Sequence, residues 1–171
     1  REFDMTGAVR PLEGIKVVEF SHMVLGPSCG VILADLGADV VKVEPAPEGD
    51  KTRLLPGSGS GFFGAFNRNK RSVTVNLKSP EGRKFAINLI RQSDVLIENF
   101  GKGVMDRLDL GYKSTQEINS KLIYCSLKGF LSGPYENRAA LDEVVQMMGG
   151  LAYMTGPKGR PLRAGASVND L

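Results

Sequence analysis

The chain has 171 residues and the composition of an ordinary globular protein, so it is long enough for one domain with a substantial hydrophobic core. Its net charge of +3 at neutral pH is too small to indicate nucleic acid as a partner, although a local basic patch could serve a phosphorylated ligand. The sequence contains no apolar stretch of membrane-spanning length and no secretory signal. These properties argue against nucleic acid and membrane partners and favour a cytoplasmic location.

The two cysteines, Cys29 and Cys125, support the same location. They fall in a predicted helix and a predicted strand, and their spacing does not match a metal-ligand motif. We therefore expect two buried thiols in a reducing compartment, and no metal site. Residues 1–10 have no clear periodicity and are expected to be a flexible lead-in or a remnant of expression, so the folded domain is expected to span residues 11–171.

The stretch 17–44 predicts a strand, a loop, a helix and a second strand. It opens with V-V-E-F, whose β-branched valines suit a buried strand. A G-P-S turn at 26–28 leads into a helix, because proline fits the first helical turn, and Gly37 fits the C-terminal cap. A second apolar strand follows at 39–43. Since open α/β sheets bind ligands where strands end and helices begin, the loop 22–28 is the first place to expect a ligand.

The rest of the chain continues this alternation of strands and helices. A helix is expected to begin with Ser79 as its N-cap and to end near Gln92. The Gly-, Ser- and Pro-rich segment 48–64 is expected to be a surface loop, and Ser114 is expected to cap a short helix. The other predicted elements are strands at 72–77, 94–98 and 122–127 and helices at 104–108, 114–119 and 141–148.

This order of elements predicts an α/β fold with a Rossmann-like, mostly parallel sheet flanked by helices. The carboxyl ends of parallel strands share one edge of the sheet, so the loops that follow them should gather there. The loops expected at this edge are 22–28, the segment after Glu44, 99–103 and 128–133.

Pattern alone leaves the candidate site residues open. His22 is the only histidine, so it is either a hydrogen-bonded loop residue or a ligand contact. The sequence has no G-x-G-x-x-G, P-loop or G-x-S-x-G motif. The basic segment 67–71 and Lys78 could hold phosphates or form a solvated surface, and Arg107 could do either. On the same grounds Asp142 could simply begin a helix, and Asp170 is one carboxylate among many.

Several longer segments, taken in order, are more specific. Those segments are P-L-E-G-I-K-V-V-E-F at 11–20, G-P at 26–27, L-G-A-D-V-V-K-V-E-P at 36–45, G-D-K-T-R at 49–53, N-R-N-K-R-S at 67–72, L-K-S-P-E-G at 77–82, D-V-L-I-E-N-F at 94–100, L-I-Y-C-S-L-K-G-F at 122–130 and G-x-S-x-x-D at 165–170. Together they resemble the family III CoA-transferases, the group that includes formyl-CoA:oxalate transferase, carnitine CoA-transferase and the 2-methylacyl-CoA racemases.

The resemblance implies transfer of coenzyme A from an acyl-CoA to a free carboxylic acid. In this family a single aspartate attacks the thioester, and the resulting anhydride is converted to an aspartyl thioester of CoA before the acceptor carboxylate takes over the CoA. Asp170 matches that aspartate and is the expected nucleophile. CoA or acyl-CoA is then a substrate, with no permanently bound cofactor and no metal. A small dicarboxylate is the default acceptor.

The resemblance also implies a set of CoA contacts, which fall in five segments. The expected contacts are His22, Val24 and Leu25 in the first loop, Val75, Asn76, Leu77 and Lys78 beside the adenosine, Asn99, Phe100 and Gly101 near the pantetheine, Arg107 at the phosphates, and Ala140, Leu141, Asp142 and Glu143 close to the thioester.

Two positions depart from patterns within the family. Where some members carry an arginine after the second strand, this chain has Pro45, and Arg68 or Arg71 is expected to compensate. Where the racemases carry a catalytic histidine, this chain has Leu141, which cannot act as a base. The sequence thus favours a transferase over the alternative of a 2-methylacyl-CoA racemase.

The chain is expected to be the N-terminal part of the family's large domain, which ends before the second half and the small domain. Members of the family form interlocked, ring-shaped homodimers, so we expect either a homodimer of full-length chains or association with the remaining C-terminal segment. A truncated fragment that binds CoA without turnover is the non-enzymatic alternative.

Overall fold

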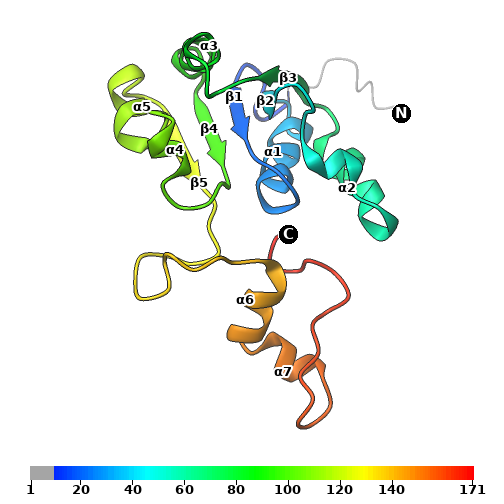
Figure 1. The fold of residues 1–171 in the computed structure, drawn as a ribbon. Helices are drawn as coiled ribbons and strands as arrows, with labels where there is room; N and C mark the ends of the chain where they lie inside the picture. The colour runs from blue at the N-terminus through cyan, green and yellow to red at the C-terminus, as the bar shows by residue number, and fades with distance from the viewer. Residues whose placement is uncertain (1–9) are drawn as a thin grey trace, which may run out of the picture.

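A computed structural model describes residues 10–171 of the chain. The lead-in expected at 1–10 lies outside this range except for Arg10. Five parallel strands form one sheet in the order β3-β2-β1-β4-β5 (Figure 1). This topology confirms the predicted α/β class. The strands are β1 (Lys16–Phe20), β2 (Asp39–Pro45), β3 (Arg71–Val75), β4 (Val95–Glu98) and β5 (Ile123–Ser126).

Helices connect the strands and continue beyond the last one. Among the described residues, no helix is long and apolar enough to cross a membrane. The α-helices are α1 (Leu25–Asp35), α2 (Phe62–Asn67), α3 (Pro80–Arg91), α4 (Val104–Arg107), α5 (Tyr112–Ile118), α6 (Asp142–Met148) and α7 (Leu151–Thr155), and the 3₁₀ helices are η1 (Lys51–Leu54) and η2 (Gly57–Gly61).

The central strand β1 packs its alternate residues on opposite faces of the sheet. Val18 lies in a core cluster with Ala86 and Ile90 of α3. Val17 lies in a second cluster with Ala34 of α1. Side chains of a strand alternate between faces, so consecutive valines serve two cores. The sheet is therefore covered on both sides, as a parallel sheet requires.

The two predicted helix caps differ in outcome. Ser79 caps α3 as expected, because its hydroxyl accepts a hydrogen bond of 3.0 Å from the backbone N–H of Gly82. Ser114 does not cap α5, because that helix already begins at Tyr112 with Gly111 as its N-cap. Thr115 donates its hydroxyl proton to the carbonyl of Gly111, which ties the start of the helix down without a capping side chain.

The segment 48–64 is more ordered than the predicted surface loop. It contains η1, η2 and the start of α2. The Asp50 carboxylate accepts the backbone N–H of Thr52 at 2.9 Å and so caps η1. Both side chains are buried. A buried carboxylate beneath the segment holds it against the sheet, which the Gly-rich composition does not reveal.

The cysteines also differ from expectation. Cys29 and Cys125 are free thiols and only half-buried. They are neighbours across the second core cluster, and burial, assisted by the Cys125 thiol, raises the pKa of Cys29 to about 11. The Cys29 thiol is therefore protonated and unreactive at neutral pH.

The C-terminal segment, residues 127–171, lies beyond the sheet rather than on one of its faces. Figure 1 shows α6 and α7 on the side to which the arrows of β1 and β4 point. The chain then returns, and its C-terminus lies between α6 and that edge of the sheet. The segment after α7 thereby brings residue 170 toward the carboxyl ends of the strands.

Candidate functional site

The site is built where the strand order reverses. Connections run from β1 outward to β2 and β3, and then from β4 outward to β5, so the order changes direction between β1 and β4. Open α/β sheets bind ligands in the crevice outside such a switch point, because the two adjacent loops diverge there. Here those loops are 21–24 and 99–103.

The two loops are tied to each other. The backbone N–H of His22 donates to the Asn99 side-chain oxygen at 3.0 Å, and the Asn99 amide donates to the His22 carbonyl at 2.9 Å. The His22 and Phe100 rings stack with centroids 5.8 Å apart. A methyl group on Gly26 would lie 2.9 Å from the Asn99 side chain, so only glycine allows this approach. The predicted contacts His22, Asn99 and Phe100 are thus brought together.

The His22 ring is held in its neutral form. Partial burial of the ring lowers the pKa of His22, against the opposing charge of Asp50. A neutral imidazole can donate or accept a hydrogen bond at neutral pH, and it can stack on a planar group.

An apolar pocket of about 190 Å³ opens beside the two loops. Most of the surface that faces the pocket is apolar, with contributions from Phe100, Pro45 and Met23. Such a lining suits a flat or chain-like organic group with a few fixed polar contacts. The lining residues are Ser21, His22, Met23, Val43, Pro45, Asp50, Lys51, Thr52, Leu55 and Phe100.

A buried network of charges, which we call the floor, adjoins this pocket through Asp50 and Ser21, which line it. The Lys42 ammonium lies 3.4 Å from Glu19 and 3.1 Å from Asp50, and it donates to the carbonyl of Ser21 at 2.7 Å. The other Glu19 oxygen lies 2.8 Å from the buried Lys70 ammonium. Each carboxylate therefore faces a cation, which a buried charge requires. The network fixes the end of β1, from which the His22 loop departs.

A second part of the floor holds the ordered 50–54 segment. The Arg53 guanidinium makes two hydrogen bonds to the Glu44 carboxylate, at 2.9 and 2.7 Å. Burial alone would raise the pKa of Glu44, but hydrogen bonds from Arg53 and Ser72 outweigh this and lower the pKa to about 2. Thr52 accepts the backbone N–H of Met23 at 3.0 Å. The pocket wall is thereby linked to the His22 loop.

The sequence analysis missed these floor residues. Lys42 and Glu44 alternate with valines in an apolar strand, and a lysine inside such a strand was the available signal. The signal does not name the partners, because Glu19 and Asp50 come from other parts of the chain.

The predicted contacts after β3 divide by orientation. Val75 lies in the first core cluster, and Leu77 packs against that cluster. Val24, a predicted contact in the first loop, is buried too. The Asn76 side chain accepts the backbone N–H of Lys78 at 3.1 Å, which makes a tight turn. Among residues 75–78, Lys78 is the one charged residue, and its side chain is exposed to solvent.

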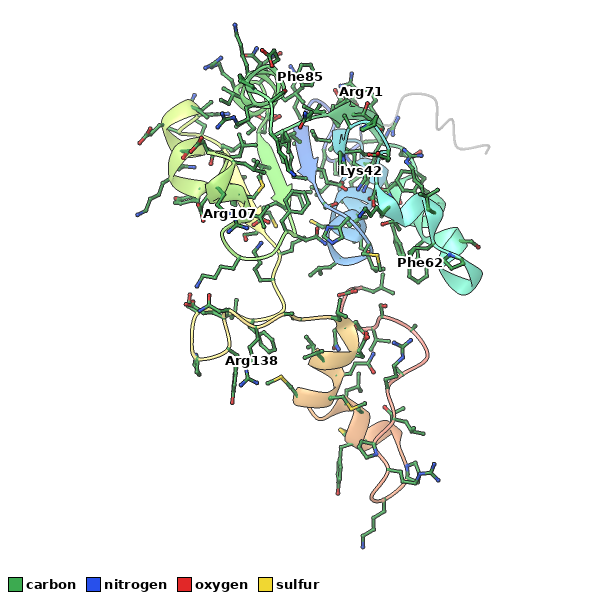
Figure 2. All side chains as sticks on the ribbon, in the orientation of Figure 1. Lys42, Phe62, Arg71, Phe85, Arg107 and Arg138 are labelled. Carbon is green, nitrogen blue, oxygen red and sulfur yellow. The ribbon has the colours of Figure 1, made fainter. Side chains whose placement is uncertain are left out.

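The predicted basic contacts lie at two different edges of the sheet. Arg107 follows the β4 loop and is exposed, and none of the ion pairs within residues 10–171 includes it or Lys78. Arg71 lies at the start of β3 and pairs with Asp39 at the start of β2. Figure 2 shows Arg71 at the edge opposite Arg107.

The expected compensation for Pro45 is therefore wrong. Arg71 lies at the amino ends of the strands, and Arg68 pairs with Asp35 at the end of α1. Lys70, in the same basic segment, is buried against Glu19. These cations serve the fold, so the segment 67–71 does not supply a phosphate site at the switch point.

The loops after β4 and β5 are joined through Glu98. Its carboxylate accepts the backbone N–H of Phe100 at 2.9 Å and the ammonium of Lys128 at 2.7 Å. Lys102 pairs with Glu136 at 2.6 Å, so the same β4 loop also holds the segment that leads to α6. Arg138 in that segment stacks over Tyr135 at 4.6 Å.

The predicted residues of the segment 140–143 lie at the start of α6, with Asp170 nearby, whereas Leu25 begins α1 and Gly101 lies in the β4 loop. Leu141 is its exposed N-cap, Asp142 is buried, and Glu143 pairs with Arg163 at 3.5 Å. Asp170 is half-buried near Asp142. Burial raises the pKa of Asp170, and the nearby carboxylates of Asp142 and Glu143 raise it further. The segment 140–143 and Asp170, far apart in sequence, therefore share one environment.

No part of this arrangement suggests a metal centre. Within residues 10–171, no group of three or more His, Cys, Asp or Glu side chains could hold a metal ion.

Comparison with known proteins decides the family. The sequence profile of CoA-transferase family III matches residues 12–171, nearly the whole chain. The chain belongs to CoA-transferase family III. This family assignment agrees with the resemblance seen in the sequence, and it covers both the switch-point loops and Asp170.

Relatives and solved structures support the same assignment. The chain is 44% identical to a formyl-CoA:oxalate CoA-transferase from Rhodopseudomonas palustris, over 94% of this chain and 39% of that protein. It is 44% identical to an acyl-CoA transferase from Fusarium pseudograminearum, over 94% of this chain and 38% of that protein. The chain thus spans about two fifths of the length of these relatives.

The fold agrees with solved members. A CaiB/BaiF family protein from Brucella suis superposes with a TM-score of 0.88 and 43% identity, over 96% of this chain and 46% of that one. Rv3272 from Mycobacterium tuberculosis superposes with a TM-score of 0.87 and 34% identity, over 95% of this chain and 46% of that one.

Proposed function

We propose that this chain carries the CoA-binding and nucleophilic parts of an enzyme that transfers CoA from an acyl-CoA to a small carboxylic acid. The observation that carries the proposal is the half-buried Asp170 carboxylate, which lies within the region that matches CoA-transferase family III. Figure 1 supports its role, because the C-terminus beside it lies toward the edge where β1 and β4 end.

The chemistry proceeds through acyl exchange at this carboxylate. Asp170 attacks the thioester carbonyl, the carbon–sulfur bond breaks, and a mixed anhydride and CoA thiolate result. The thiolate attacks the aspartyl carbonyl, which releases the acyl group as a carboxylate and leaves an aspartyl thioester. The acceptor carboxylate attacks that thioester and displaces the thiolate again. The thiolate then attacks the acceptor carbonyl of the second anhydride, which yields the new acyl-CoA and regenerates Asp170.

The environment of Asp170 supports a nucleophilic role. A carboxylate that is partly removed from water, with its pKa raised by burial, is more basic than an exposed one. Removal of water also protects the anhydride, which would otherwise hydrolyse.

The switch-point loops are proposed to hold CoA. The apolar pocket beside His22 and Phe100 fits an organic portion of the molecule rather than its phosphates. The exposed cations Arg107 and Lys78 would meet the phosphates through charge-assisted hydrogen bonds. Backbone groups of 75–77 and 99–101 would then contribute further contacts.

The names of the relatives suggest the first substrates to test. Formyl-CoA as donor and oxalate as acceptor follow from the formyl-CoA:oxalate CoA-transferases at 43–46% identity. The racemase alternative would need a proton-transfer group beside Asp142, where this chain has Leu141.

Association with further polypeptide is also proposed. Large apolar side chains remain exposed on α6 and α7, where a partner surface would remove them from water. They are Leu141, Met147, Met148, Tyr153 and Met154.

A substitution of the nucleophile tests the proposal. The chain, extended to the length of its relatives, is assayed for transfer from formyl-CoA to oxalate as Asp170→Asn and as Glu13→Gln, a control at an exposed carboxylate. Asp170→Asn should lower transfer about 10³-fold or more and leave CoA affinity within about threefold. Transfer at the wild-type rate in Asp170→Asn would overturn the proposal. CoA binding without transfer in the wild-type protein would favour the non-enzymatic alternative.

A further inference from the structure

Helix α6 buries polar residues and exposes apolar ones. Gln146 is 1% exposed and Asp142 is 7% exposed, whereas Met147 and Met148 are about half exposed. Asp142 and Gln146 are four positions apart and share one face of the helix. A helix of a globular protein usually turns its apolar face inward, so this inverted pattern requires a polar partner for the buried face.

The partner is the backbone of the segment 164–169. The Gln146 side-chain oxygen accepts the backbone N–H of Ala164 at 2.6 Å, and its amide donates to the carbonyl of Ala166 at 3.2 Å. The same amide donates to one oxygen of the Asp142 carboxylate. The other oxygen of that carboxylate accepts the backbone N–H of Asn169 at 2.7 Å. Two side chains therefore hold both ends of the segment.

The held segment cannot order itself by hydrophobic packing. Its sequence A-G-A-S-V-N offers only small side chains and one valine, and Val168 is 43% exposed. Fixing backbone in one conformation costs conformational entropy, and hydrogen bonds to buried side chains offset part of that cost here. The residue fixed last, Asn169, directly precedes Asp170.

We propose that Asp142 and Gln146 are positioning residues, which hold the 164–169 backbone so that the Asp170 carboxylate is aimed at the thioester. This inference rests on the proposed function, since it takes Asp170 as the nucleophile. It replaces the sequence-based expectation for Asp142, because both oxygens of that carboxylate are engaged within the chain rather than turned to CoA.

Substitutions at Gln146 separate positioning from packing. In Gln146→Glu the carboxylate still accepts from Ala164, but it loses the donor and places a second negative charge against Asp142. Protonation restores one donor. Gln146→Leu keeps a similar volume and offers no polar atom at any pH. Other charged groups near the site are Glu143, paired with Arg163, and Asp170 itself.

Gln116→Glu is the matched control. Gln116 also donates its side-chain amide to a backbone carbonyl, that of Leu122, but it lies in α5. The same chemical change there removes a similar hydrogen bond without touching the 164–170 segment. Its transfer rate should stay at the wild-type value.

The test measures kcat and KM for the acyl-CoA between pH 5.5 and 8.5, in the protein at the length of its relatives, with hydroxylamine trapping at residue 170. At high pH both Gln146 variants should lose about 10- to 100-fold in kcat with KM nearly unchanged, because a displaced nucleophile binds substrate but reacts poorly. As pH falls, the ratio of variant to wild-type kcat should rise for Gln146→Glu and stay low for Gln146→Leu.

Three results would overturn the proposal. A wild-type kcat in both Gln146 variants would rule out the positioning role and leave the proposed function unaffected. A raised KM with unchanged kcat would make the Asp142–Gln146 pair a CoA contact instead. Failure to trap residue 170 in the wild-type protein would overturn the proposed function, and the inference with it.

Amide exchange gives a readout that does not depend on activity. In Gln146→Leu the Ala164 amide should exchange about tenfold faster or more, since its acceptor is gone, while amides of β1 and β4 keep their wild-type rates. Unchanged exchange at Ala164 would contradict the proposed hold on the segment.

Discussion

The sheet and the C-terminal segment are stabilised in different ways. In the sheet, valines of β1 and β2 fill two cores, and the charges that are buried meet opposite charges. In the C-terminal segment, α6 buries Asp142 and Gln146 and exposes two methionines. The difference shows that the sheet is held by its own packing, whereas the segment that carries Asp170 is held by a few hydrogen bonds to backbone.

This contrast bears on the two parts of the candidate site, the sheet edge and the segment 127–171. Within the chain, the buried charges at the sheet edge contact the backbone of the first switch-point loop, through Lys42 and the Ser21 carbonyl. The segment 127–171 has fewer buried apolar side chains, so its order depends more on the α6 hydrogen bonds. Under the proposed function, CoA binding belongs to the sheet edge and the acyl chemistry to the segment 127–171.

The largest expected effect comes from breaking the buried charges of the sheet. Lys42→Ala would leave Glu19 and Asp50 buried with one cation fewer, so the free energy of unfolding should fall by about 3–5 kcal/mol. Urea unfolding of the chain measures this. Arg71→Ala, which breaks an exposed pair with Asp39, is the control and should cost less than about 1 kcal/mol. Equal decreases in the free energy of unfolding in both variants would show that the buried network stabilises the fold no more than an exposed ion pair does.

A pH series should sharpen the same comparison from the acid side. The folded-state pKa of Glu44 lies at about 2, below its ordinary value of 4.5, so its stabilising contribution is present above pH 4.5 and is lost as the pH falls toward 2. Its size should be on the order of 2 kcal/mol, since the Arg53 partner is partly exposed.

The matching variant is Glu44→Gln. Its free energy of unfolding should depend less on pH between 4.5 and 2 than that of the wild-type chain, when both are measured by urea unfolding. An identical slope in the two proteins would show that the acid sensitivity comes from other residues.

The effect of pH on stability at Asp170 is opposite to that at Glu44. The pKa of Asp170 is raised in the folded chain, so protonation at low pH favours the folded state at that residue.

The sequence predicted the sheet better than the segment beyond it. The valines of β1 and the Ser79 cap act on near neighbours, so local pattern is sufficient to predict strand and helix there. Ser114 failed as a cap because Gly111 and Thr115 already fix the start of α5. The order within 48–64 depends on the ion pair between Lys42 and Asp50, which pattern cannot reveal.

The candidate site divides in the same way. His22 and Asn99 follow strand ends, so parallel topology was enough to bring their loops together. The contact between Asp142 and Asn169 joins residues 27 positions apart in an irregular segment, which no periodicity encodes. Arg71 was expected to compensate for Pro45 on the strength of its charge alone. The predicted strand at 72–77 already put this arginine before a strand, and therefore away from the carboxyl ends where ligands bind.

The smallest expected effect concerns ligand affinity at the sheet edge. Arg107→Ala should weaken CoA binding about tenfold, because one charge-assisted contact to phosphate would be lost, and should leave stability nearly unchanged at this exposed position. Titration calorimetry with CoA measures it. Arg71→Ala again serves as the control, since it lies at the opposite edge and should bind CoA as the wild type does. Equal affinities in all three proteins would remove Arg107 from the CoA site.

The most direct test of the central claim is to find the covalent intermediate. The protein, alone and extended to the length of its relatives, is incubated with formyl-CoA or succinyl-CoA and then with hydroxylamine, which converts an aspartyl anhydride or thioester to a hydroxamate. Intact mass followed by peptide mapping locates the product. A hydroxamate at Asp170 is the predicted result, whereas turnover without any adduct at Asp170, or an adduct at another carboxylate, would contradict it.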